Sequence, residues 1–487
     1  MVMKKGNFLY EKGIAMEKKR YVLDGGQITV RMPRQDNEGF LREVWFNSTF
    51  EQNQLCIEPW EDNKVAIGEP TFLTLGEDEE YAISITEQGV GIVARDGECL
   101  KRGFVALLMR FIAVERDGAC RASLPVGEVH GRFSVDNRMI HLCLFPEHDF
   151  IFICRLIRYY CALQYTHIVL EFWGTYRFSC FPELGWEEKS YSKEQILTLV
   201  SEIRACGAEP VPFFNSLGHA PCARGCSGKH TVLDQNPALS YLFTPDGWAW
   251  DITSETVFRR LKEVREELYE LFGEGAYMMI GCDEADVYAN GYQPESVVAD
   301  YFHRLTTEIV GEGRRPIIWG DMLLYKGTFA VEGEKVFWSA NAKSEEQAEL
   351  YRRSLAEGTV IADWQYRYAA EKPLEQRTAI YLKEKGYDVI ACPFFDPKVI
   401  SATGKTVKKY RLFGYMQTMW DRIHEQPWRA MEGAIGCGLP QELWTEYGEA
   451  YSMLSGAMWR KLKSGKQSYE HLGFNDVQFV KNTRQSI

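Results

Sequence analysis

The sequence lacks any hydrophobic run long enough to serve as a signal peptide or to cross a membrane. Residues 1–20 contain basic side chains but no apolar segment of the required length. Lysine and arginine are not clustered, and the net charge is −12, which argues against nucleic acid because phosphate binding needs grouped positive charges. We therefore expect a cytoplasmic protein with no membrane or nucleic-acid partner, and the oligomeric state stays open.

The 13 cysteines lack the repeated close spacing of a disulfide framework or a zinc site. Cys222 and Cys226 come nearest to such spacing, but no second pair and no histidine doublet follows them at ligand distance. We therefore expect reduced, mostly buried thiols. The sequence predicts neither a bound metal nor another cofactor.

Two domains are expected, because 487 residues exceed one ordinary domain. Residues 1–125 have the pattern of a small α/β domain, with an alternating hairpin that turns at Gln88-Gly89 and a helical stripe that begins at Phe104. A loop from Glu115 to Val129 is expected to lead into the second domain. That domain, residues 126–487, is expected to be a barrel that carries C-terminal helices.

Eight apolar runs in the second domain are typical of buried parallel strands. Strict alternation of strand and helix implies a parallel sheet, and eight such units imply a (β/α)8 barrel. An open doubly wound sheet is the alternative; the lack of a glycine-rich phosphate motif after the first strand counts against its nucleotide-binding forms. The predicted strands are Arg138–Leu144, His167–Phe172, Pro210–Phe214, the run from Tyr277 towards Asp283, Arg315–Trp319, Thr359–Trp364, Tyr387–Cys392 and Leu412–Thr418.

The strand that begins at Tyr277 is followed by two adjacent carboxylates, Asp283 and Glu284. In a parallel barrel, residues just past the carboxyl end of a strand face the reaction site. Two acids in a poorly hydrated cleft resist ionising together, so one should keep its proton near neutral pH. Such a pair supplies a general acid and a charged stabiliser. Alone, the dipeptide is more often part of the first turn of a helix.

Carboxylates and aromatic side chains also gather at the other predicted strands. A sugar presents apolar C–H faces and hydroxyl groups, so its site needs flat aromatic walls and directional hydrogen bonds. Each tryptophan alone is more often ordinary packing, and a single histidine more often belongs to a core; only their joint placement indicates a sugar site. The residues are Arg138, Glu171, Trp173, His219, Trp319, Asp321, Trp364, Tyr366, Asp396, Trp420 and Asp421.

Several of these residues lie in motifs that resemble glycoside hydrolase family 20, the β-N-acetylhexosaminidases, with the hexosaminidase D-like branch closest. The motifs span about residues 130–430. The small domain is also similar to one that often precedes this family's barrel. The motifs are Ile280-Gly281-Cys282-Asp283-Glu284, Ser216-Leu217-Gly218-His219, the stretches around Arg138 and Trp319, and Gln417-Thr418-Met419-Trp420-Asp421-Arg422.

The resemblance implies an exo-acting hydrolase that removes terminal β-linked N-acetylglucosamine or N-acetylgalactosamine with retention. Family 20 enzymes depart from the two-carboxylate scheme, because the acetamide oxygen of the substrate is the nucleophile. By resemblance, Glu284 protonates the glycosidic oxygen and later activates water. Asp283 accepts the acetamide N–H and stabilises the cationic intermediate.

The resemblance also implies that Arg138 binds ring hydroxyls and that His219 supports the acid. Without the resemblance, an interdomain salt bridge is the expected role of Arg138, because this residue starts its strand. The tryptophans would wall the sugar and its acetamide; they are Trp319, Trp364 and Trp420.

The chain departs from the family pattern at two strands. Where a Tyr-x-Asp sequence is usual, it has Phe394-Phe395-Asp396, and Tyr366 is placed to supply the missing hydroxyl. Glu171 and the loop with Trp173 stand where the family has second-strand aspartates. Two other functions fit the residues: a glycosidase for sugars without an acetamide, with Glu171 or Asp321 as nucleophile, and a sugar-binding barrel without catalysis.

Overall fold

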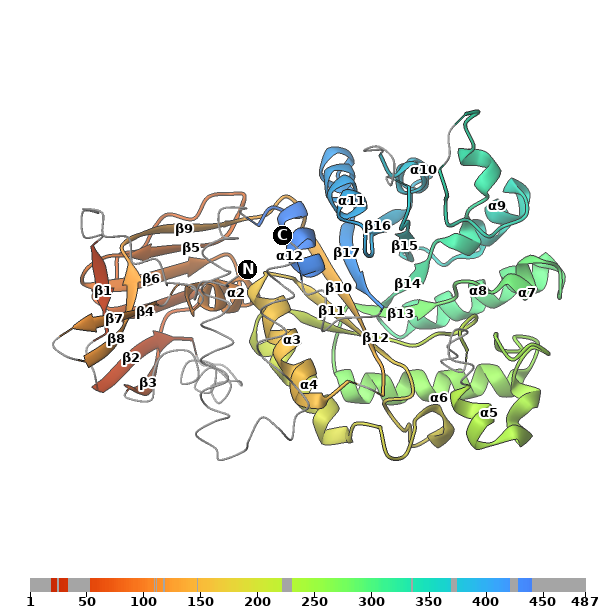
Figure 1. Cartoon of the computed structure of the whole chain (residues 1–487), viewed down its shortest axis with the longest axis horizontal. Helices are drawn as coiled ribbons and strands as arrows, with labels where there is room; N and C mark the ends of the chain where they lie inside the picture. The colour runs from red at the N-terminus through yellow and green to blue at the C-terminus, as the bar shows by residue number, and fades with distance from the viewer. Residues whose placement is uncertain are drawn as a thin grey trace, which may run out of the picture.

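The structure is a computed structural model of the chain. It contains a β-rich N-terminal part and a barrel, drawn at the left and right of Figure 1. None of the helices within the described ranges has the length and apolar character needed to span a bilayer. The described residues are 19–23, 26–33, 53–108, 110, 112–116, 119–146, 148–220, 230–333, 336–368, 375–420 and 428–439.

Two sheets build the N-terminal part, one of six strands in the order β3-β2-β4-β6-β5-β9 and one of three in the order β1-β8-β7. The expected hairpin is confirmed as the antiparallel pair β5 and β6, and α2 (Gly97–Leu108) packs on both strands. The strand bounds are β1 Arg20–Val22, β2 Gly26–Met32, β3 Asn53–Pro59, β4 Lys64–Gly68, β5 Glu79–Ile85, β6 Gly89–Ala94, β7 Ile112–Arg116, β8 Ala119–Pro125 and β9 Gly127–Arg132.

The loop expected from Glu115 to Val129 is wrong, because β7, β8 and β9 occupy much of that stretch. Polar residues at many positions of these strands account for the weak apolar pattern of the stretch, and β9, at the edge of the six-stranded sheet, is mostly exposed. Since β9 pairs with β5, the N-terminal sheet continues past residue 125 to Arg132.

The eight predicted strands form a closed barrel in which neighbours pair in parallel, so the predicted (β/α)8 fold is confirmed. Continuous apolar runs suit such strands because helices cover their outer face while side chains fill the interior. The strands are β10 Asn137–Leu144, β11 His167–Phe172, β12 Glu209–Phe213, β13 Tyr277–Gly281, β14 Arg315–Trp319, β15 Val360–Trp364, β16 Asp388–Cys392 and β17 Gly414–Met419.

Helices follow the barrel strands and pack around them (Figure 1). Ser192 and Gln195 form a capping box that starts α4, and Ser254 caps α6, which satisfies N–H groups that a first turn leaves unpaired. The helices are α3 Phe150–Ala162, α4 Lys193–Ala205, α5 Thr231–Gln235, α6 Glu255–Phe272, α7 Asp286–Ala289, α8 Glu295–Gly311, α9 Glu345–Ser354, α10 Arg377–Glu384, α11 Pro397–Tyr410 and α12 Trp428–Gly436.

The barrel interior changes character along its axis. Near the amino-terminal ends of the strands, apolar side chains such as Met139, Val169 and Ile317 form a closed, buried layer. Two residues further along the same strands stand His141, Glu171 and Trp319. Because side chains two apart on a strand point to the same face, these residues enter the interior at the carboxyl end, where barrel active sites lie.

Arg138 lies at the opposite end and joins the two parts of the molecule. Its Nη1 and Nη2 donate to Glu80 Oε1 and Oε2 at 2.8 and 3.1 Å, and Glu80 belongs to β5. Arg102 of α2 donates to the same carboxylate at 2.8 Å and to the carbonyl of Gly207 in the barrel. The sugar-binding role implied for Arg138 is therefore wrong, whereas the interdomain salt bridge expected from its position is confirmed.

Candidate active site

The acid pair follows β13 through an unusual backbone. The pairing of β13 with β14 is irregular between Met279 and Gly281, and Gly281 has a φ of 65°. Cys282 and Glu284 also have positive φ values, 71° and 46°. Left-handed conformations are costly for residues with a side chain and persist only where surrounding contacts impose them. The structure therefore directs two consecutive carboxylates into one site at an energetic cost.

The preceding loop supplies His219 and fits closely against the acids. His219 Nε2 lies 3.1 Å from Glu284 Oε2 and 3.6 Å from Asp283 Oδ2. The approach needs Gly218, because a Cβ at that position would stand 1.9 Å from the carbonyl oxygen of Asp283. Trp248 holds the other side, with its ring 4.3 Å from that of His219 and its Nε1 donating to the carbonyl of Glu284 at 2.9 Å.

Burial and charge set unlike protonation tendencies for these three groups. Burial raises the pKa of Asp283 to about 7, and Glu284 and Glu171 add to the shift while His219 opposes it. The hydrogen bond from His219 lowers the pKa of Glu284, which remains partly exposed. Burial disfavours a charged His219, but Asp283 and Glu284 outweigh it and raise its pKa to about 9. Without substrate, the proton expected on one acid therefore favours Asp283, while Glu284 faces an imidazolium ion.

A third carboxylate, Asp321, lies under the pair. It follows β14, is 1% exposed, and accepts the backbone N–H of Glu284 at 2.9 Å. Burial, and next the charge of Asp283, raise the pKa of Asp321 well above its ordinary value, while its hydrogen-bond donors oppose the shift.

The fourth carboxylate, Glu171 on β11, is bound inside the barrel. It pairs with His141 Nε2 at 2.8 Å and accepts a hydrogen bond from Asn215. The His141 ring lies 4.4 Å from that of Trp420. Sequence reasoning missed His141 and Asn215; the spacing of two residues from the buried Met139 was the available signal for His141.

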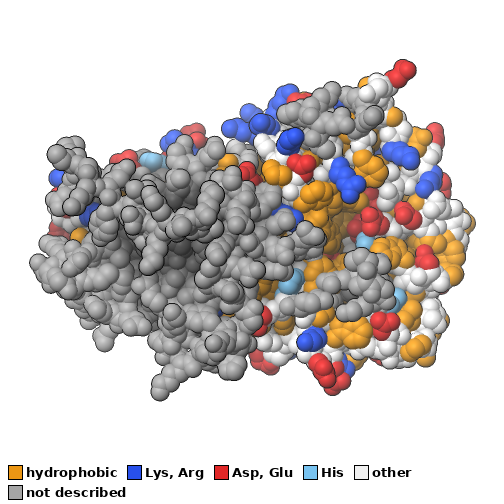
Figure 2. Space-filling view, in the orientation of Figure 1, with side chains coloured by type: hydrophobic (Ala, Val, Ile, Leu, Met, Phe, Trp, Pro, Cys, Tyr) orange, Lys and Arg blue, Asp and Glu red, His pale blue; other side chains and the backbone are white. Residues whose placement is uncertain are grey.

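Aromatic rings line the same end of the barrel. Trp319 is fully buried, and its ring centre lies 5.8 Å from that of Trp420. Trp364 and Trp420 are half-buried, and Tyr366 lies 5.1 Å from Trp364, measured between ring centres. The structure thus brings together the tryptophans predicted to wall a sugar. In Figure 2, hydrophobic side chains gather in a hollow of the barrel half, bordered by acidic side chains and a histidine.

The hydroxyl of Tyr366 belongs to this group. It accepts Trp420 Nε1–H at 2.7 Å, and Thr418 Oγ1 stands 3.5 Å away. Burial raises the pKa of Tyr366 well above its ordinary value, and the charge of nearby Asp283 adds to the shift. Within the described residues, the acceptor for the hydroxyl proton of Tyr366 is Thr418 Oγ1, whose own proton goes to the carbonyl of Pro393 at 2.7 Å. At 3.5 Å this contact is weak, so a ligand oxygen can take the proton in a shorter hydrogen bond.

Two predicted residues are placed differently. Asp396 caps α11, where its Oδ1 accepts the backbone N–H of Lys398 at 2.8 Å, so a substrate contact of Asp396 stays a prediction. Asp421 lies outside the described residues, as do Cys222 and Cys226. In the described part of the chain, no group of three or more His, Cys, Asp or Glu side chains is arranged to hold a metal ion.

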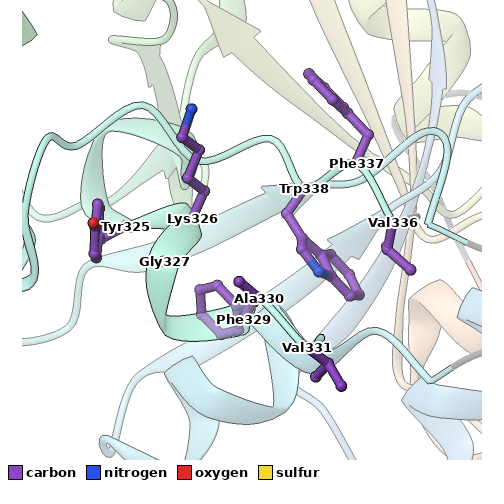
Figure 3. A pocket seen from close by; sticks show the side chains of 9 residues that line it. All are labelled: Tyr325, Lys326, Gly327, Phe329, Ala330, Val331, Val336, Phe337 and Trp338. Carbon is purple, nitrogen blue, oxygen red and sulfur yellow. The ribbon is translucent and has the colours of Figure 1, made fainter. Parts of the chain in front are cut away.

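A separate hollow of about 370 Å³ lies on the loop after β14 (Figure 3). Among the described residues, its wall shares none with the acid site, and Lys326 is the single charged group that lines it. One wall residue, Trp338, stacks on Tyr368 with 5.6 Å between ring centres. The wall consists of Tyr325, Lys326, Gly327, Phe329, Ala330, Val331, Val336, Phe337 and Trp338.

The chain matches a glycoside hydrolase family and resembles solved glycosidase structures. The family model described as glycosyl hydrolase family 20, catalytic domain, matches residues 170–464, more than half of the chain. A β-N-acetylhexosaminidase from Bacteroides fragilis is 16% identical, with a TM-score of 0.59 over 91% of this chain and 92% of that one. The family 20 β-N-acetylhexosaminidase from Streptomyces coelicolor is 14% identical, with a TM-score of 0.60 over 91% and 93%.

An exo-β-N-acetylglucosaminidase from Vibrio harveyi, solved with N-acetylglucosamine, is also similar. It is 14% identical and has a TM-score of 0.60 over 90% of this chain and 75% of that chain. Such low identities show a shared fold. No curated protein shows significant sequence similarity to the chain.

Proposed function

Since the chain belongs to glycosyl hydrolase family 20, we propose that it is an exo-acting, retaining β-N-acetylhexosaminidase. It removes terminal β-linked N-acetylglucosamine or N-acetylgalactosamine, with the acetamide oxygen of the substrate as nucleophile. The similar Vibrio harveyi structure, which holds N-acetylglucosamine, supports this substrate class. A cytoplasmic location and a place in the hexosaminidase D-like branch remain predictions from the sequence.

One observation carries the proposal: Asp283 offers a free acceptor beside a histidine-bound acid. Asp283 Oδ1 is buried and has no hydrogen-bond partner among the described residues, while His219 lies at 3.1 Å from Glu284. An acetamide N–H donated to Asp283 would satisfy this oxygen and favour the ionised carboxylate. That carboxylate then stabilises the positive charge that develops when the acetamide oxygen attacks the anomeric carbon.

The same contacts suggest how Glu284 obtains its proton. A bound sugar would cover the exposed part of the Glu284 side chain and thereby favour its neutral form. At the same time, the acetamide N–H favours loss of the proton from Asp283. His219 lies between the two acids, within 3.6 Å of each, so its imidazolium can give a proton to Glu284 and remain as a neutral imidazole beside the ionised Asp283. Glu284 then protonates the leaving oxygen and afterwards activates water.

Tyr366 is our candidate for the group that holds the acetamide oxygen. Trp420 Nε1–H donates to the oxygen of its hydroxyl at 2.7 Å, so the hydroxyl proton can be donated to a ligand. Phe394, which stands at the usual tyrosine position, contacts the Tyr366 ring with 5.3 Å between centres. The hydroxyl lost at one strand is therefore offered by its neighbour, which preserves orientation of the nucleophilic oxygen.

The test is hydrolysis of a nitrophenyl N-acetyl-β-glucosaminide and its galactosaminide counterpart by the full chain. We expect turnover of at least one, tight inhibition by a thiazoline that mimics the cyclised intermediate, and negligible cleavage of nitrophenyl β-glucoside, which has no acetamide. Equal cleavage of the glucoside without thiazoline inhibition would indicate the acetamide-independent glycosidase. Binding of N-acetylglucosamine without turnover of either substrate would indicate a sugar-binding barrel.

The pH dependence of kcat/KM should follow Asp283 and His219, because this quantity reports ionisations of the free enzyme. Asp283 must be ionised to accept the acetamide N–H, so activity should fall as pH drops below about 7. His219 must be protonated to supply Glu284, so activity should fall as pH rises above about 9. The His219→Gln variant should lose the alkaline limb; retention of that limb would assign it to another group.

Replacing Tyr366 by phenylalanine should lower kcat by about 100-fold, the usual cost of losing one donor to a developing charge. KM should change much less, because the hydroxyl mainly orients the acetamide for attack. Steady-state kinetics on the N-acetylglucosaminide measure both constants. Tyr368→Phe is the matched control: its hydroxyl contacts Thr403 at 2.6 Å rather than the site, so kcat should stay near wild type. Equal losses in the two variants would reject the assigned role.

A further inference from the structure

The contacts of Asp321 differ from those expected of a substrate ligand. Oδ2 accepts the backbone N–H of Glu284 at 2.9 Å and Asn341 Nδ2–H at 2.7 Å. Oδ1 accepts Trp364 Nε1–H at 3.1 Å. The residue is 1% exposed. Both oxygens thus serve donors from the protein, and the carboxylate is closed off from a sugar or an anomeric carbon.

The first of these contacts fixes the proposed acid. Glu284 has a φ of 46°, a region that its side chain disfavours. Its N–H is bound by Asp321, and its C=O accepts Trp248 Nε1–H at 2.9 Å. Two side chains from different loops are therefore hydrogen-bonded to the peptide groups on either side of the Glu284 Cα. The orientation of these two peptide planes determines the direction of the Cα–Cβ bond. The contact with Asp321 therefore fixes the direction in which the Glu284 side chain leaves the backbone.

Asp321 is itself held by a buried polar network that reaches β15. The backbone N–H of Asn341 donates to the Asp321 carbonyl at 2.7 Å, which locks the loop that returns Asn341 to the site. Gln365 binds both the N–H and the C=O of Ser339 in the same loop, at 2.8 and 3.1 Å. Gln365 in turn donates to the fully buried Asp363 at 2.8 Å. Such a satisfied network favours one arrangement over alternatives.

We infer that Asp321 is a positioning residue that fixes both Glu284 and the Trp364 wall and does not touch the substrate. This inference rests on the proposed function. Two roles expected from the sequence are thereby replaced. One is a contact between Asp321 and the sugar, and the other is Asp321 as the nucleophile of a glycosidase for sugars without an acetamide. Its action on catalysis passes through the placement of the acid relative to the glycosidic oxygen.

The test uses two substrates that differ in their need for an acid. A dinitrophenyl leaving group departs without protonation, whereas a methyl group requires the acid. In Asp321→Asn, an NH2 group replaces one carboxylate oxygen and faces a group that also donates, so the contact with the Glu284 peptide or with Trp364 is lost. Because a shift of about 1 Å in a reacting group can cost about 100-fold, kcat/KM on methyl N-acetyl-β-glucosaminide should fall by about that factor. On the dinitrophenyl glycoside it should fall by less than about 5-fold.

Two further variants keep the inference open to rejection. Asn341→Ala removes one donor to Asp321 and should give the same selective loss, about 10-fold on the methyl glycoside; it decides the matter if Asp321→Asn does not fold. Asp388→Asn makes the same chemical change at a surface ion pair with Arg315 at the other end of the barrel, and both substrates should be cleaved as by wild type.

The outcomes separate the inference from the function on which it rests. A wild-type protein that cleaves neither glycoside overturns the proposed function. A wild type that cleaves both, with equal losses on both substrates in the Asp321 and Asn341 variants, overturns only the positioning role. A large rise in KM for both substrates would instead make Asp321 a ligand of the sugar.

Discussion

Glu284→Gln should reduce kcat/KM on an alkyl or oligosaccharide N-acetyl-β-glucosaminide by about 1,000-fold, within the range for loss of a general acid and base. The amide keeps the shape of the side chain and can still accept the hydrogen bond that His219 donates at 3.1 Å. It has no acidic proton to give to the leaving oxygen and cannot later activate water. Steady-state kinetics with the full-length variant measure the loss.

The control for this substitution is Asp286→Asn, two positions further along. Asp286 is exposed in the first turn of α7, where an amide is tolerated, so activity should remain within about 3-fold of wild type. Turnover by Glu284→Gln at the wild-type rate would falsify the assignment of the acid.

Glu80→Gln should lower the free energy of unfolding by about 3–5 kcal/mol, the usual cost of removing one partner from a buried ion pair. Glu80 is 5% exposed and binds both Arg102 and Arg138. Burial opposes its charge, but these two guanidinium groups hold the pKa of Glu80 below its ordinary value. The amide would leave two positive groups facing each other without the charge that balances them. Urea unfolding followed by tryptophan fluorescence measures the change.

The neighbouring residue provides a matched comparison. Glu79 is also buried, but the side chains of its partners Arg132 and His130 are 59% and 35% exposed, so water can solvate the charge left behind. Glu79→Gln should therefore cost only about 1 kcal/mol. Similar losses in the two variants would show that the Glu80 cluster does not depend on its charge.

The barrel could be predicted from the sequence because both sides of its strands are buried. Such a strand must be largely apolar, as the run from Ile168 to Leu170 is, and that pattern is visible without knowledge of tertiary contacts. The strands β7, β8 and β9 of the N-terminal part contain polar residues at many positions, and β9 is mostly exposed. This composition explains why they were expected to be a loop.

The acid site was predictable where it depends on position along a strand and not where it depends on partners across strands. Asp283 and Glu284 follow an apolar run, and the fold alone brings them to the carboxyl end. The pairing of His141 with Glu171 requires the register between β10 and β11, which no local pattern contains. Trp248 was missed for a similar reason, because its contact with Glu284 closes a long loop.

The location of the proton also needed the structure. The sequence indicated that two adjacent acids would share one charge, but it could not show which of them His219 would touch more closely. At 3.1 Å from Glu284 and 3.6 Å from Asp283, the histidine favours ionisation of the more exposed acid. The resting protein is therefore prepared for a transfer of its proton when the substrate arrives.

The two glycines beside the acids limit how this enzyme can be redesigned. A methyl group on Gly218 would meet the Asp283 carbonyl at 1.9 Å, and one on Gly281 would meet Asn215 Oδ1 at 2.1 Å. Neither glycine position can accept a larger residue unless the loops separate and the acids move. Substitutions meant to change the substrate range should therefore begin at the outer edge of the site, away from the loops that contain Gly218 and the acids.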